Sequence, residues 1–137
     1  MSDTDALIAE ARAALKNAHA PYSNFPVGAA LRTRSGRVFR GANVENASLG
    51  LSVCAERAAV HAAVTAGERD FESLAVATEA TEPTPPCGSC RQVLLEFVPD
   101  LEILLVGRSG PVERQRLAEL MPRPFRSYSP DASSKDR

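Results

Sequence analysis

The spacing of hydrophobic residues changes several times along the chain, and each change predicts a different element of secondary structure. Over Thr4–Ala18 the apolar residues recur with a period near 3.6, which predicts an amphipathic helix that Pro21 ends. Two strands follow at about Val27–Thr33 and Arg37–Asn43. Gly36 lies between them and allows the positive φ angle of a tight hairpin turn. The chain therefore begins with a helix and an antiparallel hairpin.

The rest of the chain alternates between helical and extended patterns. Five further elements are predicted: a helix over Cys54–Gly67 with Ser52 as its candidate cap, a buried strand at Leu74–Thr78, a helix over Cys90–Phe97, a second buried strand at Leu101–Val106 and a short helix over Arg114–Leu120. Strands and helices in this order predict a three-layer α/β domain. We expect one domain over residues 1–126 and a flexible tail over residues 127–137.

Composition narrows the class of protein. The 137 residues are 44% hydrophobic, which is enough for one compact core. The net charge is −1 and charged residues are scattered, so we expect a small substrate and not a nucleic acid. Three cysteines are an odd number, which argues against a disulfide framework and for a reducing compartment. The acidic start lacks a continuous apolar run, so we expect no signal peptide, no membrane span and a cytoplasmic location.

The three cysteines form a pattern that is typical of a metal centre. Cys54 is followed two residues later by Glu56, and Cys87 and Cys90 form a C-x-x-C pair. Three thiolates fill three positions of a tetrahedral Zn²⁺ and leave the fourth for water, as in catalytic zinc sites. Three alternatives stay open: an accidental trio of buried cysteines, a redox dithiol, and a structural zinc whose fourth ligand is an acid. His61 cannot supply that ligand, since it lies two helical turns beyond the first cysteine.

Helix geometry restricts where these side chains can meet. In the middle of a helix, residues two apart point about 200° away from each other, so Cys54 and Glu56 can share a site only at a first turn. Cys87 and Cys90 are three apart, and they too suit a helix start. Two helix N-termini would then face the metal and offset the negative charge of the thiolates. Arg57 either adds to this effect or is an ordinary surface residue.

Residues outside the metal motif are candidates for binding the substrate. Asn43 and Glu45 are two apart at the end of a predicted strand, so their side chains leave on one face and suit a sugar hydroxyl. An asparagine-rich turn is the equally good local alternative. Phe25 either stacks against a pyrimidine ring or fills the core.

Four segments in order give the chain its resemblance to a known family. PYSNFPVGAAL, NVENAS, VCAERAAV and PCGSCRQVLLEF cover about Pro21–Phe97, and together they resemble the small homotetrameric zinc-dependent cytidine deaminases of the cytidine/deoxycytidylate deaminase superfamily. The resemblance implies a three-layer α/β/α sandwich around a mixed five-stranded sheet. It also implies one zinc per chain and hydrolytic deamination of cytidine and deoxycytidine to uridine and deoxyuridine, with release of ammonia, in pyrimidine salvage.

The resemblance also implies a role for each site residue. The implied roles are zinc ligation by Cys54, Cys87 and Cys90, hydrogen bonding to the ligand sulfurs by Arg57, proton transfer by Glu56, binding of the ribose 3′-hydroxyl by Asn43 and Glu45, contact with the base by Phe25 and the Ala55 backbone, and a contact from a neighbouring subunit by Phe125. Active sites would thus be shared within a homotetramer.

Two departures from the family pattern affect which of the implied roles can be applied to this chain. Leu49 stands where the family usually has tyrosine, so any subunit contact through that hydroxyl is missing. Arg126 follows Phe125, where the family commonly has glycine, and this leaves the orientation of the phenylalanine open. Deaminases of the antibiotic blasticidin S share the motifs and are the alternative enzyme, and a non-enzymatic zinc module is the alternative from another class.

Overall fold

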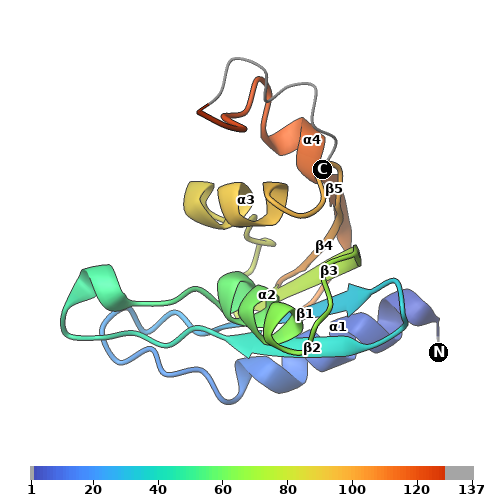
Figure 1. Cartoon of the computed structure of the whole chain (residues 1–137). Coiled ribbons are helices and arrows are strands. Elements are labelled where there is room, and N and C mark those ends of the chain that lie inside the picture. The colour runs from blue at the N-terminus through green and yellow to red at the C-terminus, as the bar shows by residue number, and fades with distance from the viewer. Residues whose placement is uncertain (1, 129–137) are drawn as a thin grey trace.

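The computed structural model describes residues 2–128, which form five strands and several helices (Figure 1). In chain order the elements are α1 (Asp3–Leu15), β1 (Val27–Thr33), β2 (Val38–Ala42), the short 3₁₀ helix η1 (Leu49–Leu51), α2 (Ala55–Thr65), β3 (Phe71–Thr78), α3 (Gly88–Leu95), β4 (Glu102–Val106), β5 (Glu113–Arg116) and α4 (Leu117–Leu120). The tail expected from residue 127 lies, from residue 129 onward, outside the described residues.

The five strands form one mixed sheet in the order β2-β1-β3-β4-β5. β3 and β4 are parallel, and the other neighbouring pairs are antiparallel. Helix α1 covers one face of the sheet, while α2 and α3 cover the other (Figure 1). This arrangement confirms the predicted three-layer α/β/α sandwich with a mixed five-stranded sheet.

Alternation along β1 shows how the sheet separates two cores. Ala29 and Leu31 are fully buried toward α2, whereas Ala30 between them is fully buried toward α1. Gly28 lies directly under α1, because a Cβ atom there would come within 2.1 Å of the Ala11 carbonyl oxygen. The small residues on this side of β1 therefore let α1 pack closely onto the strand.

Local signals in the sequence placed several element boundaries correctly. Gly36 in the hairpin has a φ of 92° and Gly67 after α2 has a φ of 91°, the left-handed conformation that glycine adopts without strain. The first helix is shorter than predicted, and its cap is Ser2, whose hydroxyl accepts a hydrogen bond from the Asp5 N–H at 3.1 Å. Ser52 does not cap α2, since Cys54 is the residue that precedes its first turn.

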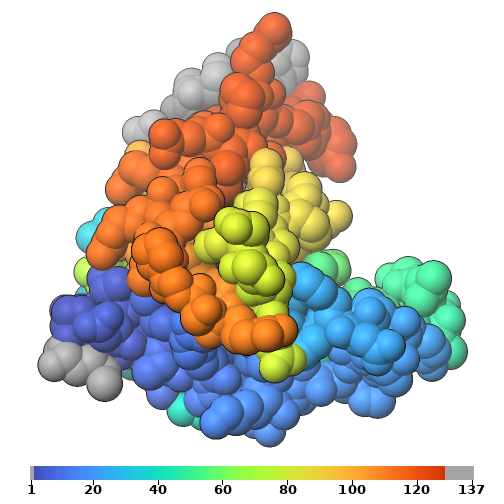
Figure 2. All heavy atoms as spheres, turned by 180° about the vertical axis from the view of Figure 1, so that it is seen from behind, coloured from blue at the N-terminus to red at the C-terminus, as the bar shows by residue number. Residues whose placement is uncertain are grey.

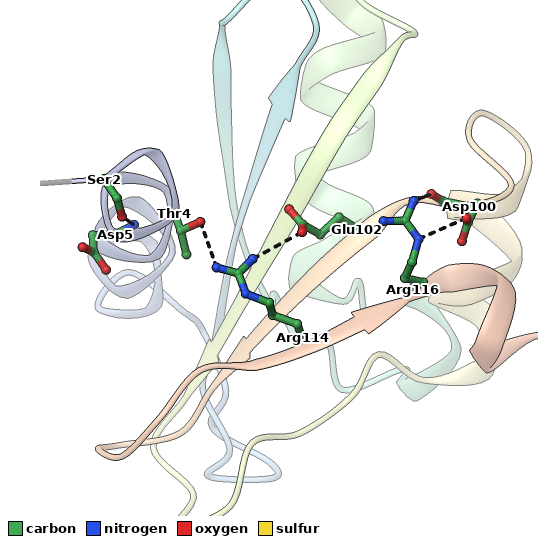
Figure 3. Close-up of polar contacts among 7 residues, drawn as sticks. All are labelled: Ser2, Thr4, Asp5, Asp100, Glu102, Arg114 and Arg116. Atoms are coloured by element: carbon green, nitrogen blue, oxygen red, sulfur yellow. Dashed lines mark hydrogen bonds and ion pairs between the residues drawn. The ribbon is translucent and has the colours of Figure 1, made fainter.

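The prediction of a helix over Arg114–Leu120 was half wrong. Its first part is strand β5, which pairs with β4, and only the second part is the short helix α4. Side chains of β5 also contact neighbouring elements, since Arg114 lies 3.3 Å from the Glu102 carboxylate of β4 and donates to the Thr4 hydroxyl of α1 at 3.3 Å (Figure 3). Pairing with the preceding strand β4 thus overrode the local helical pattern.

Membrane insertion was not expected from the sequence. Across residues 2–128, none of the helices has the length and the apolar character that a membrane span requires.

Candidate active site

The three cysteines come together at the starts of two helices. Cys54 is the N-cap of α2, Cys87 is the N-cap of α3, and Cys90 lies in the first turn of α3. The Sγ atom of Cys87 lies 4.0 Å from that of Cys54 and 3.5 Å from that of Cys90. All three sulfurs are within 4.8 Å of one another. Three thiol donors around one point are a set that suits Zn²⁺, which favours tetrahedral sulfur coordination.

Close packing of backbone on backbone holds the start of α2 in place. A Cβ atom at Gly41 of β2 would come within 2.2 Å of the Ala55 carbonyl oxygen and 2.5 Å of the Ala59 nitrogen. The first turn of α2 therefore lies directly on the strand. Cys54 and Glu56, on either side of Ala55, are positioned by this contact.

A similar contact positions the loop that leads to Cys87. A Cβ atom at Gly107 would come within 2.6 Å of the Ala80 carbonyl oxygen, and the Arg108 N–H donates to the same oxygen at 2.8 Å. Figure 2 shows this loop, in yellow-green, against the orange segment that follows β4. The start of α2 and the beginning of the loop before Cys87 are thus both held through the main chain.

Arg57 faces the cysteine cluster from the first turn of α2. Its Nη2 atom lies 3.4 Å from the Cys54 sulfur and 3.4 Å from the Ser52 carbonyl oxygen. Its Nε atom is buried and has no hydrogen-bond partner among the described residues. A cation held here favours the thiolate form of the neighbouring sulfurs and so fits a metal-binding site.

Burial perturbs the titration of two groups in the cluster. Glu56 is only 5% exposed, and this burial raises the pKa of its carboxyl group, although Arg57 and the backbone N–H partly oppose the shift. Burial also raises the pKa of the Cys90 thiol, and the nearby Glu56 and Cys54 add to the effect. Metal binding at these residues would therefore displace a proton from Cys90.

A pocket of about 260 Å³ opens beside the cysteines. Seven of the predicted site residues line it: Phe25, Asn43, Glu45, Cys54, Ala55, Glu56 and Cys87. The other six lining residues were not predicted as site residues: Ser23, Val27, Val76, Thr78, Thr84 and Pro85. Pro85 stands two residues before Cys87 and Ser23 two before Phe25, so nearness to motif residues was the one signal that could have indicated them.

Asn43 and Glu45 tie the loop between α1 and β1, residues 20–26, to the end of β2. The Asn43 amide accepts a hydrogen bond from the Val27 N–H at 2.8 Å and donates one to the Phe25 carbonyl oxygen at 2.9 Å. Oε1 of the Glu45 carboxylate accepts a hydrogen bond from the Tyr22 N–H at 2.9 Å. Both side chains are therefore fixed before any ligand arrives.

Phe125 lies apart from the pocket of its own chain. Its side chain is 58% exposed, and its ring packs edge-on against Tyr128 with the centroids 5.5 Å apart. The Gln92 side chain of α3 donates to the Phe125 carbonyl oxygen at 2.9 Å. The C-terminal segment is thus attached to the helix that carries Cys90.

Comparison with known proteins agrees with this geometry. The family model for the cytidine and deoxycytidylate deaminase zinc-binding region matches residues 1–104. A cytidine deaminase of Halalkalibacterium halodurans is 46% identical over 124 residues, which are 90% of this chain and 94% of the relative. The crystal structure of a cytidine deaminase from Burkholderia pseudomallei is 49% identical, covers 91% of this chain and 100% of its own, and superposes with a TM-score of 0.87.

A relative with another named substrate is less similar. A blasticidin-S deaminase of Bacillus cereus is 29% identical over 104 residues, which are 70% of this chain and 74% of that protein. Fold, site and relatives together define the class: the chain belongs to the cytidine and deoxycytidylate deaminase family. It is an enzyme, as its cytidine deaminase relatives are.

Proposed function

We propose that the chain catalyses the hydrolytic deamination of cytidine and deoxycytidine to uridine and deoxyuridine, with release of ammonia. The observation that carries the proposal is the pocket of about 260 Å³ in which Cys54, Cys87 and the buried Glu56 meet. Relatives named cytidine deaminase at 46% and 49% identity support the choice of substrate.

Cys54, Cys87 and Cys90 would hold one Zn²⁺ per chain. The three sulfurs converge, and the Arg57 guanidinium lies beside them with an Nε that has no hydrogen-bond partner among the described residues. The residues present therefore fit this metal. When bound, zinc makes water a nucleophile at neutral pH by lowering its pKa.

Glu56 carries the protons in the proposed reaction. It accepts a proton from the attacking water and donates it to ring nitrogen N3 while the water oxygen adds to C4 of the cytosine. The proton of the new C4 hydroxyl then passes to the exocyclic nitrogen, the C4–N bond breaks as the C4 carbonyl forms, and ammonia leaves. Cytidine and water thus give uridine and ammonia. The Ala55 backbone borders the pyrimidine edge, and Phe25 lies beside the base.

The far end of the pocket binds the sugar in this proposal. Asn43 and Glu45 supply donor and acceptor atoms for the ribose 3′-hydroxyl, and both keep free hydrogen-bonding capacity beyond their contacts within the chain. The contacts proposed for Asn43 and Glu45 are to the 3′ position and not to the 2′ position, so we propose that both nucleosides are substrates.

We propose that the enzyme is a homotetramer whose subunits complete one another's sites. Leu49 and Leu51 of η1 are 72% and 67% exposed on a segment that projects from the body of the chain (Figure 1). Exposed apolar side chains of this kind favour burial against another protein surface. Phe125, outside its own pocket, would then contact the substrate of a neighbouring subunit.

We place the enzyme in the cytoplasm, in pyrimidine salvage. All three cysteines are free thiols, as a reducing compartment would keep them. A small nucleoside is the expected partner, and neither a nucleic acid nor a membrane is needed.

Ammonia release by the purified protein tests the proposal. Cytidine, deoxycytidine, cytosine, CMP and blasticidin S are compared, and zinc is counted per chain. We expect turnover of the two nucleosides with about one zinc per chain. Turnover of blasticidin S alone would replace the nucleosides with the antibiotic as substrate, and zinc without any turnover would favour a binding module.

A further inference from the structure

One serine hydroxyl joins the Glu45 side chain to the backbone of Phe25, two residues that were assigned to different parts of the substrate. Ser23 Oγ donates a hydrogen bond to Glu45 Oε2 and accepts one from the Phe25 N–H at 3.0 Å. Ser23 also lines the pocket. The resemblance gave roles to Phe25 and Glu45 but none to the residue between Tyr22 and Asn24.

The contacts of Ser23 and Tyr22 account for most of the hydrogen-bonding capacity of the Glu45 carboxylate. Oε1 accepts from the Tyr22 N–H at 2.9 Å and from the Ser23 N–H at 3.1 Å, and Oε2 accepts from the Ser23 hydroxyl. A carboxylate offers about four acceptor positions, so about one is left, on Oε2. These donors also lower the pKa of the Glu45 carboxyl, with the Ser23 hydroxyl as the main cause.

The direction of the serine proton is determined by its neighbours. Because the Phe25 N–H occupies a lone pair of Ser23 Oγ, the hydroxyl proton points to Glu45. The turn is fixed by Asn24, which has a φ of 57° and whose N–H donates to the Ala20 carbonyl oxygen at 3.0 Å. Asparagine tolerates this left-handed conformation better than most residues.

We infer that Ser23 is a positioning residue that holds the Glu45 carboxylate in the orientation in which Oε2 accepts the sugar hydroxyl of the substrate. The inference rests on the proposed function, since it takes Glu45 as the group that binds this hydroxyl. Without the Ser23 hydroxyl, two backbone N–H groups would still hold Oε1, but Oε2 would be free to turn away or to bind water. The loss should therefore appear in binding of the sugar and not in the chemistry at the base.

The test compares cytidine with 3′-deoxycytidine, which lacks the hydroxyl in question. For Ser23→Ala we expect kcat/KM for cytidine to fall about tenfold, mostly through KM, because a hydrogen bond to a charged group is lost. For 3′-deoxycytidine the same variant should change kcat/KM less than about twofold, since the affected contact is absent. Ser23→Thr keeps the hydroxyl and should restore most of the activity toward cytidine.

Two further variants separate positioning from general damage to the fold. Ser35→Ala removes an equivalent contact far from the pocket, the hydrogen bond of Ser35 Oγ to Glu68 at 2.9 Å, and should leave both substrates unaffected. Adding Ser23→Ala to Glu45→Gln should cost little more than Glu45→Gln alone, because the two residues act through one contact. Zinc per chain is measured throughout.

Equal losses of kcat/KM for cytidine and 3′-deoxycytidine in Ser23→Ala would overturn the inference and leave the deaminase activity intact. It would also fail if the wild-type protein used both substrates equally well, since Glu45 would then not bind the 3′-hydroxyl. Failure of the wild-type protein to deaminate cytidine would instead refute the proposed function. The three results are distinguishable in one set of assays.

Discussion

The two ends of the pocket are built by different means. At the metal end, the cysteines lie at the starts of α2 and α3. Main-chain packing at Gly41 fixes the first turn of α2, and packing at Gly107 holds the beginning of the loop that leads to α3. At the other end, where we propose that the sugar binds and which we call the sugar end, Asn43 and Glu45 are held by hydrogen bonds to an exposed loop. We therefore expect a side-chain change at the metal end to affect either metal binding or proton transfer. A change at the sugar end should also alter the orientation of the side chains that it contacts.

The largest effect is expected for Cys87→Ala. This residue is exposed and contributes a thiol but little packing, so its loss should remove the metal and leave the fold intact. We expect zinc per chain to fall close to zero and deamination to fall at least about 10³-fold, because the nucleophile is no longer available at neutral pH. Metal analysis, turnover and thermal unfolding check this. Ser89→Ala is the neighbouring control, and zinc retained in Cys87→Ala would remove this cysteine from the ligand set.

Glu56→Gln should separate proton transfer from metal binding. The substitution keeps the shape of the side chain but removes its ability to accept a proton, so we expect a loss in kcat of about 10²- to 10⁴-fold with zinc unchanged. Glu72 of β3 is exposed, and Glu72→Gln is the matched control. A kcat near that of the wild type in Glu56→Gln would exclude this carboxylate from the mechanism.

The same contrast explains what the sequence could predict. Cys54 and Glu56 can share a site only at the start of a helix, and the structure places Cys54 at the N-cap of α2. This prediction needed only the rise and turn of a helix. Gly36 and Gly67 were likewise located by local chemistry, since both adopt a positive φ.

Contacts between separate elements could not be predicted in this way. Strand β5 exists because Glu113–Arg116 pairs with β4, and its sequence has no apolar alternation to indicate this. Ser23 lies 22 residues from Glu45, and nothing in the local sequence links the two. Phe125 was expected to contact a neighbouring subunit, a role that stays a prediction.

A substitution at Gly41 would disturb the metal end through the backbone, and Gly28 offers a matched control. Gly41 lies under the first turn of α2 and Gly28 lies under α1, and a Cβ atom at either would clash with a helix carbonyl at 2.2 Å or 2.1 Å. We expect Gly41→Ala and Gly28→Ala each to lower the free energy of unfolding by about 1–3 kcal/mol through overpacking. Only Gly41→Ala should also weaken zinc binding, because only α2 carries a ligand at the crossing. Denaturant unfolding and zinc titration of the folded proteins measure the two effects, and equal zinc affinity in both variants would contradict the role of Gly41.

The smallest effect is expected at the attachment of the C-terminal segment. Gln92 donates from α3 to the Phe125 carbonyl oxygen at 2.9 Å, and this is an exposed hydrogen bond between neutral groups. Gln92→Ala should therefore raise KM by about two- to tenfold and leave kcat and zinc unchanged, since it loosens the segment whose Phe125 we propose to contact the substrate of a neighbouring subunit, and it touches no reacting group. Gln115→Ala removes another exposed glutamine hydrogen bond, to the Glu113 carboxylate on β5, and is the control.

Assembly determines how the Gln92 result is understood. If Phe125 reaches the pocket of a neighbouring subunit, the KM change in Gln92→Ala should disappear in the Phe125→Ala background, because the two substitutions then affect one contact. Sedimentation velocity would show whether both variants keep the oligomeric state of the wild type. A KM change that persists without Phe125 would mean that Gln92 acts within its own chain, and the sharing of sites between subunits would lose its support from this segment.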